Sequence, residues 1–504
     1  MPQQLPVFKR SGLRLAVVVT VGTRSHVAPI FESLRVLADD PSNQIEFITG
    51  GVAIKHAADF TFVKTVILED IVAPDLNTHI IALAMQTRQH ISNIEIYRLS
   101  VRAMARSYED NARVFLDYFG KNPYDLVICD FMDRAALDVL RELGHRFIIQ
   151  SPLGIRGVGA EWYIPDLFAP MPVDRWISSP WRRIKTRLGY VPLIPDALYV
   201  RKMMIEARHR LNFKTPFLDL DEYLRQTFVL SHHVLGVDPA RSLPTNYLVF
   251  GPIVYEEALP PLEPEILCEL DRLHATGAHV VFMAFGTVLH LRDAPELYER
   301  LIRGIAGLLE ATSFTAHPVA FMWPAKFHDA AKVRAMQDRF PGRFFAPRWV
   351  NQRRALQHEA VRMIISHAGY ASLVEAMYFG KPQLLIPFVA DEFMNAHNAE
   401  AVGVALQMDK YKFTTAEMVR KCTRLLRDAM DASSSLAQNV QRWQRICFMN
   451  NATSKVAVPN AILMAAAAGM DHLIPVNAAM TLLDRIGGKL AVRCHGSVDE
   501  RRRL

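Results

Sequence analysis

The chain has 504 residues, of which 50% are hydrophobic and 22% are charged, so it can bury two or three sizeable cores. Its 58 basic and 51 acidic side chains leave a net charge of +7, a mild excess that suits anionic substrates or an anionic membrane surface. No zinc-finger, RNP-type or basic-zipper pattern accompanies this charge, which argues against nucleic-acid binding.

Cysteine spacing and hydropathy bear on the cellular compartment. The apolar run 15–21 is followed by no small-residue cleavage site, and the apolar segment 456–470 contains Pro459 and is shorter than the roughly 20 residues that a membrane span needs. The cysteines form no CxxC pair, which argues against a zinc site and a disulfide framework and indicates a reducing compartment. We therefore expect a cytoplasmic protein whose only membrane contact is peripheral. The cysteines are Cys129, Cys268, Cys422, Cys447 and Cys494.

The first predicted element is a buried parallel strand over residues 13–20. The loop 23–29 follows it and contains His26, and a helix is predicted from about residue 28 to residue 37. His26 thus lies at the carboxyl end of a strand, where open α/β sheets bind ligands. An imidazole with its ordinary pKa near 6.5 can take a proton from a hydroxyl at physiological pH, so His26 is a candidate general base.

A carboxylate candidate follows the strand predicted over residues 126–129. A histidine base works best when a carboxylate holds its far nitrogen and stabilises the imidazolium. Asp130 ends this strand, which should lie parallel to the first, so Asp130 is the candidate partner of His26. Asp125 and Asp133 are alternatives, and a further alternative is that Asp130 merely caps the following helix.

Residues 162–204 combine aromatic and basic side chains. Such a stretch can form an apolar pocket for an acceptor, can rest on an anionic membrane surface, or can be an ordinary amphipathic lid. Farther on, Asp219-Leu220-Asp221 looks like a metal-binding DxD triplet but lies in a polar helical stretch, so we expect no metal ion there. The residues of the first stretch are Trp162, Tyr163, Trp176, Trp181 and Tyr190, among Arg175, Arg182, Arg183, Lys185 and Arg187.

Strand-like apolar runs alternate with helical patterns in both halves of the chain, which is typical of α/β units with parallel sheets. Between the halves, a Gly251-Pro252 turn is followed by the acidic, proline-rich stretch 256–265, and we place a domain boundary there. The runs are 15–20, 45–49, 126–129 and 147–150, then 280–285, 319–323, 363–366 and 383–387.

Segment 349–392 carries the most specific pattern. It predicts a strand over residues 361–365, a turn at 366–369 and a helix from about Ser372. The first N–H groups of a helix have no internal partner and attract an anion. Gly369 permits a close approach of the backbone, and His367 and Ser372 add hydrogen-bond donors, so a phosphate would fit this turn.

Acidic side chains follow at two places. Glu375 lies one helical turn after Ser372 on the same face, where a carboxylate can accept hydrogen bonds from two ribose hydroxyls. Gly380-Lys381-Pro382 ends the helix, residues 383–387 read as the next strand, and Asp391-Glu392 stands at its carboxyl end.

Segment 349–392 resembles the donor-sugar signature of the UDP-glycosyltransferases, the family 1 enzymes of the two-domain GT-B fold. Two positions depart from the family pattern, because Asn351 replaces a proline and Glu392 replaces the glutamine after Asp391. A carboxylate only accepts hydrogen bonds, so Glu392 is expected to repel a sugar carboxylate such as that of a glucuronic acid donor. The matching residues are Trp349, Gln352, Leu356, His358, His367, Gly369, Ser372, Glu375, Ala376, Gly380, Pro382, Pro387 and Asp391.

The resemblance implies a role for each candidate residue. In the first loop the family carries a Ser-His or Gly-His pair followed by proline, so the role of base transfers to His26 and that of orienting aspartate to Asp130. The implied donor-binding set is Trp349 by the uracil, His367 and Ser372 on the diphosphate with Gly369, Glu375 on the ribose, Asp391 on sugar hydroxyls, and also Gln352, Glu392 and Thr287.

The implied reaction is an inverting, metal-independent transfer from a UDP-sugar to a hydroxyl of a small hydrophobic, phenolic or lipid-like acceptor. A hexose is expected, with glucose favoured, and no cofactor is expected besides the UDP-sugar co-substrate. The alternative is a catalytically inactive nucleotide-sugar-binding protein of the same fold. A nicotinamide oxidoreductase is disfavoured because no GxGxxG follows the first strand.

The implied organisation is that of a GT-B enzyme, with two Rossmann-like domains whose parallel sheets face a central cleft. Residues 1–255 would form an acceptor-binding domain, 256–275 the linker and 276–440 the nucleotide-sugar-binding domain. Residues 441–486 would form helices that cross back to the first domain, and 487–504 a mobile basic tail.

Overall fold

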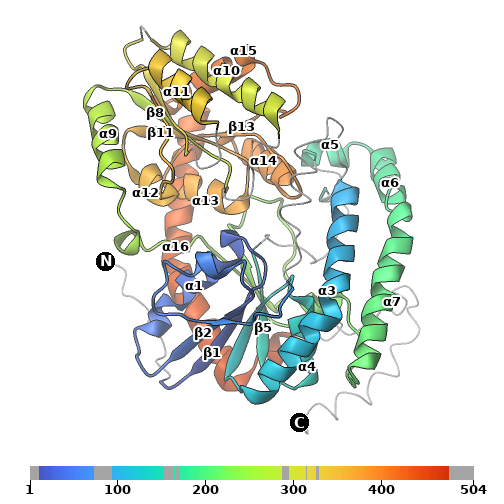
Figure 1. The fold of residues 1–504 in the computed structure, drawn as a ribbon. Coiled ribbons are helices and arrows are strands. Elements are labelled where there is room, and N and C mark those ends of the chain that lie inside the picture. Colours follow the sequence, from blue (N-terminus) through green and yellow to red (C-terminus); the bar gives the residue numbers. More distant parts are fainter. Residues whose placement is uncertain are drawn as a thin grey trace.

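The computed structural model describes residues 11–72, 93–152, 163–165, 171–286, 294–313, 315–324 and 329–475. Two domains, each built on a parallel sheet flanked by helices, lie one above the other in Figure 1. The first sheet has the strand order β3-β2-β1-β4-β5-β6-β7 and the second the order β10-β9-β8-β11-β12-β13. This architecture confirms the prediction of an α/β chain with two Rossmann-like domains.

Both sheets reverse their strand order at one point. In the first sheet β1 pairs with β2 on one side and β4 on the other, and in the second sheet β8 pairs with β9 and β11. Loops that leave such a point diverge and open a crevice at the carboxyl ends of the strands. The strands are β1 Arg14–Val18, β2 Gln44–Thr49, β3 Lys64–Ile67, β4 Leu126–Asp130, β5 Phe147–Ser151, β6 Val229–His232, β7 Tyr247–Phe250, β8 His279–Ala284, β9 Val319–Met322, β10 Phe344–Phe345, β11 Val361–Ser366, β12 Gln383–Leu385 and β13 Ala405–Gln407.

Each sheet is covered on both faces, which explains why its central strands are apolar without alternation. In β1, Leu15 and Val17 pack into one hydrophobic cluster, and Ala16 and Val18 pack into the cluster on the other face. The same division applies to β8 in the second domain. The helices of the first domain are α1 Arg24–Ala38, η1 Ile54–His56, α3 Asn93–Lys121, α4 Arg134–Glu142, α5 Val173–Ile177, α6 Pro180–Leu188, η2 Val191–Leu193, α7 Ile194–Arg210 and α8 Leu220–Gln226.

The connection between the domains contains more structure than a linker. Helix α9 begins inside the stretch 256–275, and its Ile266, Leu270 and Leu273 pack into the core of the second domain. Apolar positions every three to four residues place this helix on the second sheet. The remaining helices are η3 Glu256–Ala258, α9 Pro264–Ala275, α10 Pro295–Ala311, α11 Ala330–Arg339, α12 Gln352–Gln357, α13 Tyr370–Tyr378, α14 Glu392–Ala401, α15 Thr415–Met430, α16 Ser435–Ala468 and η5 Asp471–Leu473.

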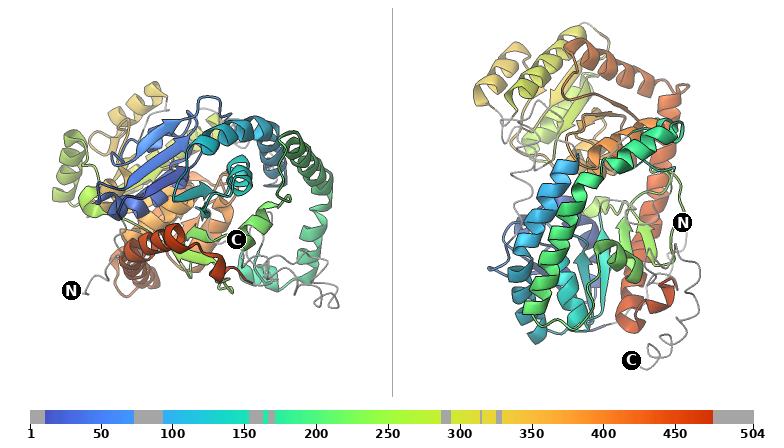
Figure 2. Two further views of the ribbon diagram at one scale, coloured as in Figure 1. Left: turned by 90° about the horizontal axis from the view of Figure 1, so that it is seen from below. Right: turned by 90° about the vertical axis from the view of Figure 1, so that its right-hand side faces the viewer.

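The 34-residue helix α16 runs along both domains, as the red helix of Figure 2 shows. Trp443 and Cys447 near its start pack into the second domain, whereas Val458 and Ile462 farther along pack into the first. Between these parts, Asn451 Oδ1 accepts a hydrogen bond of 2.9 Å from the backbone N–H of Val254. None of the helices in the described ranges is both long enough and apolar enough to span a membrane.

Candidate active site

The candidate base and its carboxylate meet at the switch point of the first sheet. His26 lies in the first turn of α1, directly after β1, and Asp130 is the last residue of β4. His26 Nδ1 lies 2.8 Å from Asp130 Oδ2, and Asp130 is fully buried. A carboxylate accepts hydrogen bonds only, so Nδ1 donates its hydrogen and Nε2 keeps a free lone pair.

Neighbouring groups fix this pair in position. Gln150 Nε2 donates to Asp130 Oδ2 at 2.9 Å and to the carbonyl oxygen of His26 at 2.6 Å. The other carboxylate oxygen of Asp130 accepts a hydrogen bond of 2.9 Å from the backbone N–H of Met132. The imidazole orientation is therefore set by two strands and a loop rather than by His26 alone.

The other two aspartates that the sequence leaves open have different partners. Asp125 precedes β4 and accepts a hydrogen bond of 2.8 Å from the backbone N–H of Arg14, so it lies at the opposite edge of the sheet. Asp133 accepts hydrogen bonds from the backbone and the hydroxyl of Thr20, and it occupies the N-cap position of α4. Burial and the charge of Asp130 raise the pKa of Asp133 to about 7.

The pKa of His26 is raised above 6.5 by a balance of opposing effects. Burial, the largest of them, lowers it, but the charge and the hydrogen bond of Asp130 outweigh the burial. Asp133 and Asp391 add smaller contributions in the same direction. Asp391 belongs to the second domain, so its carboxylate acts on the imidazole across the junction of the two domains.

The switch point of the second sheet carries the candidate phosphate site. Helix α13 follows β11 after the turn 367–369, with Gly369 at its N-cap position. A Cβ atom on Gly369 would lie 2.4 Å from His367 Nε2, and one on Gly286, at the end of β8, would lie 3.3 Å from the same atom. The two glycines thus leave room for the imidazole beside the helix N-terminus.

His367 is a neutral donor rather than a cation. Burial lowers its pKa to about 4, against a smaller opposing effect of Asp391. At neutral pH the ring therefore carries one N–H, which can donate a single hydrogen bond, either to the neighbouring carbonyl oxygen of Ala284 or to a phosphate oxygen. The positive charge at this site comes from the N-terminus of α13.

The candidate ribose carboxylate belongs to a network that connects the two domains. Gln352 Nε2 donates to Ser372 Oγ at 3.1 Å and to Glu375 Oε2 at 2.7 Å. Arg353 Nε donates to the other oxygen of Glu375 at 2.7 Å, and its terminal nitrogen lies 3.1 Å from Glu32 Oε1 on α1. The structure thus brings Gln352, Ser372 and Glu375 together. It also adds Arg353 and Glu32, which the sequence reasoning missed because neither belongs to the family pattern and 321 positions separate them.

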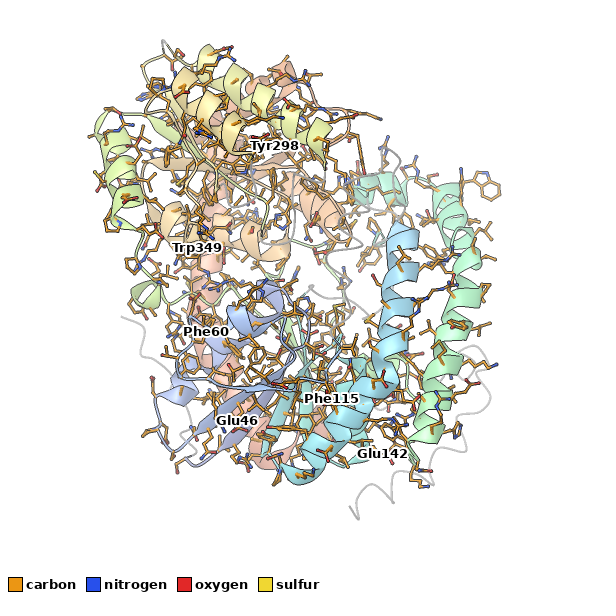
Figure 3. All side chains as sticks on the ribbon, in the orientation of Figure 1. Glu46, Phe60, Phe115, Glu142, Tyr298 and Trp349 are labelled. Atoms are coloured by element: carbon orange, nitrogen blue, oxygen red, sulfur yellow. The ribbon has the colours of Figure 1, made fainter. Side chains whose placement is uncertain are left out.

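The indole ring of Trp349 is exposed, so a nucleobase can stack on it. Trp349 is 53% exposed, and Figure 3 places it on the side of the second domain toward the first. Asn351, which replaces the usual proline, is the N-cap of α12, and its side chain accepts a hydrogen bond from the backbone N–H of Arg354. The departure from the family pattern therefore provides an alternative start for the same helix. Thr287 lies outside the described residues.

Asp391 and Glu392 have different surroundings although they are adjacent. Asp391 Oδ2 accepts a hydrogen bond from Asn395 Nδ2 and stays partly exposed. Glu392 is buried, and its Oε2 accepts hydrogen bonds from the backbone N–H groups of Phe388 and Val389 at 2.7 and 2.9 Å. Burial raises the pKa of Glu392 to about 8, so the group is largely uncharged at neutral pH. The sequence led us to expect that Glu392 repels a sugar carboxylate. Because Glu392 is largely uncharged, Asp391 is the one of these two groups whose charge can do so.

The DxD triplet is a helix cap. Asp219 accepts a hydrogen bond from the backbone N–H of Glu222, and Glu222 accepts one from the backbone N–H of Asp219, which together form a capping box at the start of α8. Among the described residues, no three His, Cys, Asp or Glu side chains form a group that could hold a metal ion.

A small cavity of about 30 Å³, partly open to solvent and with room for only a few water molecules, lies at the carboxyl end of β1. It is bounded by the end of β1, by the loop before α4 and by α3. The side chains that line it are apolar and polar in similar number, and Asp133 is among the polar ones. The lining includes Val21, Met104, Tyr108, Phe115, Met132 and Asp133.

Comparisons with known proteins identify a related family. Residues 274–441 match the family model described as UDP-glucoronosyl and UDP-glucosyl transferase. The chain is 26% identical to a UDP-glycosyltransferase of Talaromyces amestolkiae over 88% of this chain and 85% of that protein. It is 22% identical to the human UDP-glucuronosyltransferase 3A2 over 68% and 63%.

Solved structures share the fold at lower identity. The glycosyltransferase of kitacinnamycin aligns with a TM-score of 0.63 at 15% identity, over 93% of this chain and 100% of that chain. The glycosyltransferase VinC in complex with DTDP aligns with a TM-score of 0.57 at 18% identity, over 89% and 100%. Residues 274–441 therefore form a UDP-glycosyltransferase domain, and the chain is a glycosyltransferase with the two-domain GT-B fold.

Proposed function

We propose that this enzyme transfers a hexose, with glucose favoured, from its UDP-sugar to a hydroxyl of a small hydrophobic, phenolic or lipid-like acceptor, with inversion at the anomeric carbon. The single observation that supports this mechanism best is the buried His26–Asp130 pair, which leaves His26 Nε2 as a base beside the domain junction. An imidazole whose pKa is raised by an adjacent carboxylate is a stronger base and is suited to removing a proton from a hydroxyl in the transition state.

At the anomeric carbon, the chemical step forms one bond and breaks one. The acceptor oxygen bonds to the anomeric carbon of the sugar while its proton passes to His26 Nε2. The bond between the anomeric carbon and the phosphate oxygen breaks with its electron pair, so UDP leaves from the opposite face. Asp130 stabilises the imidazolium that forms, and the proton later passes to solvent.

The leaving diphosphate is assigned to the N-terminus of α13. Negative charge that develops on the phosphate oxygen is met by the helix dipole, by the N–H of His367 and by the hydroxyl of Ser372. These donors are preorganised by β11 and by the contacts of Gln352, which reduces the reorganisation needed during the reaction. We assign no metal ion or other cofactor to this step.

The remaining donor contacts follow from the same arrangement. The exposed indole of Trp349 is assigned to the uracil, and Glu375 to the ribose hydroxyls. Asp391 is assigned to the sugar hydroxyls, because its carboxylate acts electrostatically on both His26 and His367 and so lies near both the base and the phosphate site. A carboxylate at this position favours a neutral hexose over a sugar acid.

The acceptor hydroxyl is assigned to the space beside His26 Nε2, because the cavity lined by Met104, Phe115 and Met132 is too small, at about 30 Å³, to hold an acceptor. The cavity lining combines apolar and polar side chains in similar number, so the preference for a hydrophobic, phenolic or lipid-like acceptor rests on the family resemblance. Asp133, with its pKa near 7, belongs to this lining and can accept or donate a hydrogen bond.

Replacement of the base tests this mechanism. We expect His26→Ala to abolish sugar transfer while UDP still binds with the affinity of the unchanged protein. His317→Ala, at an exposed histidine of the second domain, serves as the matched control and should retain full activity. Unchanged transfer by His26→Ala would refute the mechanism. UDP binding without turnover in the unchanged protein, across a broad acceptor panel, would instead support an inactive nucleotide-sugar-binding protein.

A further inference from the structure

Helices α5, α6 and α7 expose a continuous series of large apolar side chains. Each exposes between 41% and 77% of its surface, and the most exposed is the indole of Trp181. Soluble proteins seldom leave so many neighbouring apolar side chains uncovered, and such patches usually mark an interaction site. We call the following residues the apolar stripe: Ile177, Trp181, Ile184, Leu188, Val191, Ile194, Leu198 and Tyr199.

The stripe occupies one face of α6. Trp181, Ile184 and Leu188 are three and four positions apart, so they project from the same side of the helix. None of the nine residues of α6, all of which the structure describes, is buried. Because most helices gain their stability by packing an apolar face, the apolar face of α6 is suited to a partner outside this chain.

The following helix continues the pattern and then turns basic. Ile194 and Leu198 lie one turn apart on α7, and Arg201 and Lys202 follow on the same side one turn later. The residues of α7 that are buried are Asp196 near its start and Met204, Ala207 and Arg208 in its second half.

Cations dominate the surroundings of the stripe. Between residues 173 and 202 the acidic side chains are Asp174 and Asp196. Both oxygens of Asp196 face arginines of α3, namely Arg98 and Arg102. Its charge is therefore neutralised within the chain. The cations of the segment are Arg175, Arg182, Arg183, Lys185, Arg187, Arg201 and Lys202.

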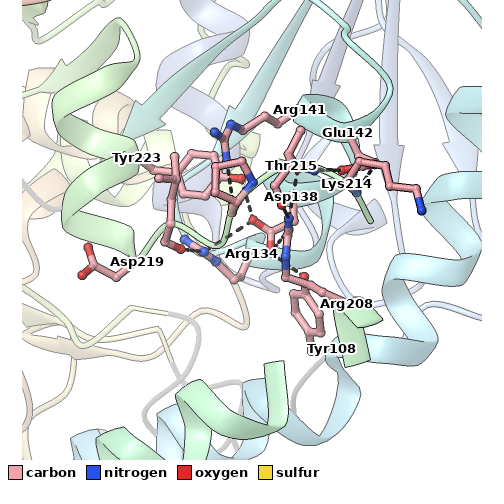
Figure 4. Close-up of polar contacts among 12 residues, drawn as sticks. Tyr108, Arg134, Asp138, Arg141, Glu142, Arg208, Lys214, Thr215, Asp219 and Tyr223 are labelled. Atoms are coloured by element: carbon pink, nitrogen blue, oxygen red, sulfur yellow. Dashed lines mark hydrogen bonds and ion pairs between the residues drawn. The ribbon is translucent and has the colours of Figure 1, made fainter. Parts of the chain in front are cut away.

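The far end of α7 is anchored in the first domain by a buried carboxylate, as Figure 4 shows. Asp138 of α4 is fully buried and accepts hydrogen bonds from the hydroxyls of Tyr108 and Tyr223, while Arg208 of α7 lies 3.0 Å from it. Together with the Asp196 contacts, this network holds α7 against α3 along two of its turns. Figures 1 and 2 show α6 and α7 on the outer side of α3, so the stripe is presented from a fixed support.

We propose that the segment 173–202 is a docking surface for an anionic phospholipid membrane, with the apolar stripe in the interface and the seven cations on the headgroups. Interfacial helices carry this combination of Trp, Leu and Ile on one face with Arg and Lys beside them. A second copy of the chain fits less well. Symmetric pairing of the stripe would bring two sets of seven cations together, and like charges repel.

Vesicle flotation of the full chain tests the proposal. We expect the protein to float with vesicles of phosphatidylcholine mixed with phosphatidylserine, to bind phosphatidylcholine alone much more weakly, and to dissociate at high salt. Lys185→Glu with Arg187→Glu should weaken binding by at least about 25-fold, since each lost cation accounts for about fivefold. Trp181→Ser with Leu188→Ser should also weaken it, whereas Leu267→Ser with Met449→Ser, which changes exposed apolar residues outside the segment, should not.

The outcomes separate the partner classes. Because the altered side chains are exposed, all variants should unfold at the temperature of the unchanged protein, and transfer to a water-soluble acceptor should also be unchanged. Absence of binding to anionic vesicles, or equal binding by the stripe variant, would overturn the proposal. A dimer in solution that the stripe variant dissociates would assign the surface to a second copy. Loss of transfer to a soluble acceptor with vesicle binding intact would assign it to the acceptor site.

Discussion

Two opposing effects act on the pKa of His26. Burial disfavours its charged form, while the adjacent Asp130 carboxylate favours it, and the second influence prevails so that the pKa lies above 6.5. Only the neutral imidazole can act as a base, so the rate should fall as the pH drops through that pKa. The same carboxylate that makes His26 a stronger base therefore moves the acid limb of activity toward neutral pH.

Replacement of Asp130 by asparagine should show both effects. Loss of the negative charge leaves burial as the main influence, so the apparent pKa of the acid limb should move to lower pH. Because the imidazolium is then no longer stabilised, the rate on the plateau should fall by about 100-fold or more. The pH profile of kcat/KM measures both changes. Asp125→Asn, which lies at the opposite edge of the sheet, is the control, and equal profiles for the two variants would contradict the pairing.

The residue pairs differ in how far the sequence predicts them. His26 and Asp130 are 104 positions apart, yet each follows a strand-like run, and the rule that parallel strands share a carboxyl edge brings them together. Glu32 and Arg353 leave no such signal, because their contact depends on how two domains meet. The sequence also placed Glu392 on the sugar, since the fold of the turn 388–391 around its carboxylate cannot be read from a local pattern.

At the scale of elements, the turn after β12 illustrates how a loop is shaped to present one residue. Glu392 accepts two backbone hydrogen bonds from this turn, and Lys410 Nζ donates to the carbonyl oxygen of Phe388 at 2.7 Å. These contacts fix the turn that carries Asp391. The long apolar strands were predictable because both of their faces are buried. The strands β3, β6, β7, β10 and β13, each of no more than four residues, were not predicted.

Two substitutions of Glu392 distinguish a role in holding the turn 388–391 from a role in sugar binding. Glu392→Gln keeps an oxygen that accepts both backbone hydrogen bonds, so the KM for the donor should change by less than about threefold. Glu392→Ala leaves two buried N–H groups without that acceptor and should lower the free energy of unfolding by about 2 kcal/mol or more. Chemical denaturation and donor kinetics provide the measurements. A large donor effect of glutamine with unchanged stability would show that Glu392 contacts the sugar instead.

At the scale of the whole molecule, two connections hold the domains in register. Helix α16 contributes side chains to both cores, and Arg353 bridges Glu375 of the donor site and Glu32 of α1. Helix α1 also carries His26, so the candidate ribose carboxylate and the candidate base are linked through a single guanidinium. Donor binding and the position of the base are therefore expected to be coupled.

Arg353→Met should break this link. Removing one partner of a largely buried ion network leaves carboxylates uncompensated, so the free energy of unfolding should fall by roughly 3 kcal/mol. The KM for the donor should rise as well, because Glu375 loses the group that orients it. Glu32→Gln should lower stability by less and leave UDP affinity near normal. Calorimetry of UDP binding distinguishes the two, with Arg334→Met at an exposed site as control, and unchanged UDP affinity in Arg353→Met would refute the coupling.

The central claim is that the second domain binds a uridine nucleotide at the N-terminus of α13. Thermal unfolding with UDP, GDP, NADH and a panel of UDP-sugars tests it without knowledge of the acceptor. A ligand at about 100 times its dissociation constant adds about 2.7 kcal/mol to the native state, which corresponds to a clear rise in Tm. We predict a rise that is selective for UDP and its sugars and is reduced in His367→Ala. No rise with any uridine nucleotide would contradict the assignment.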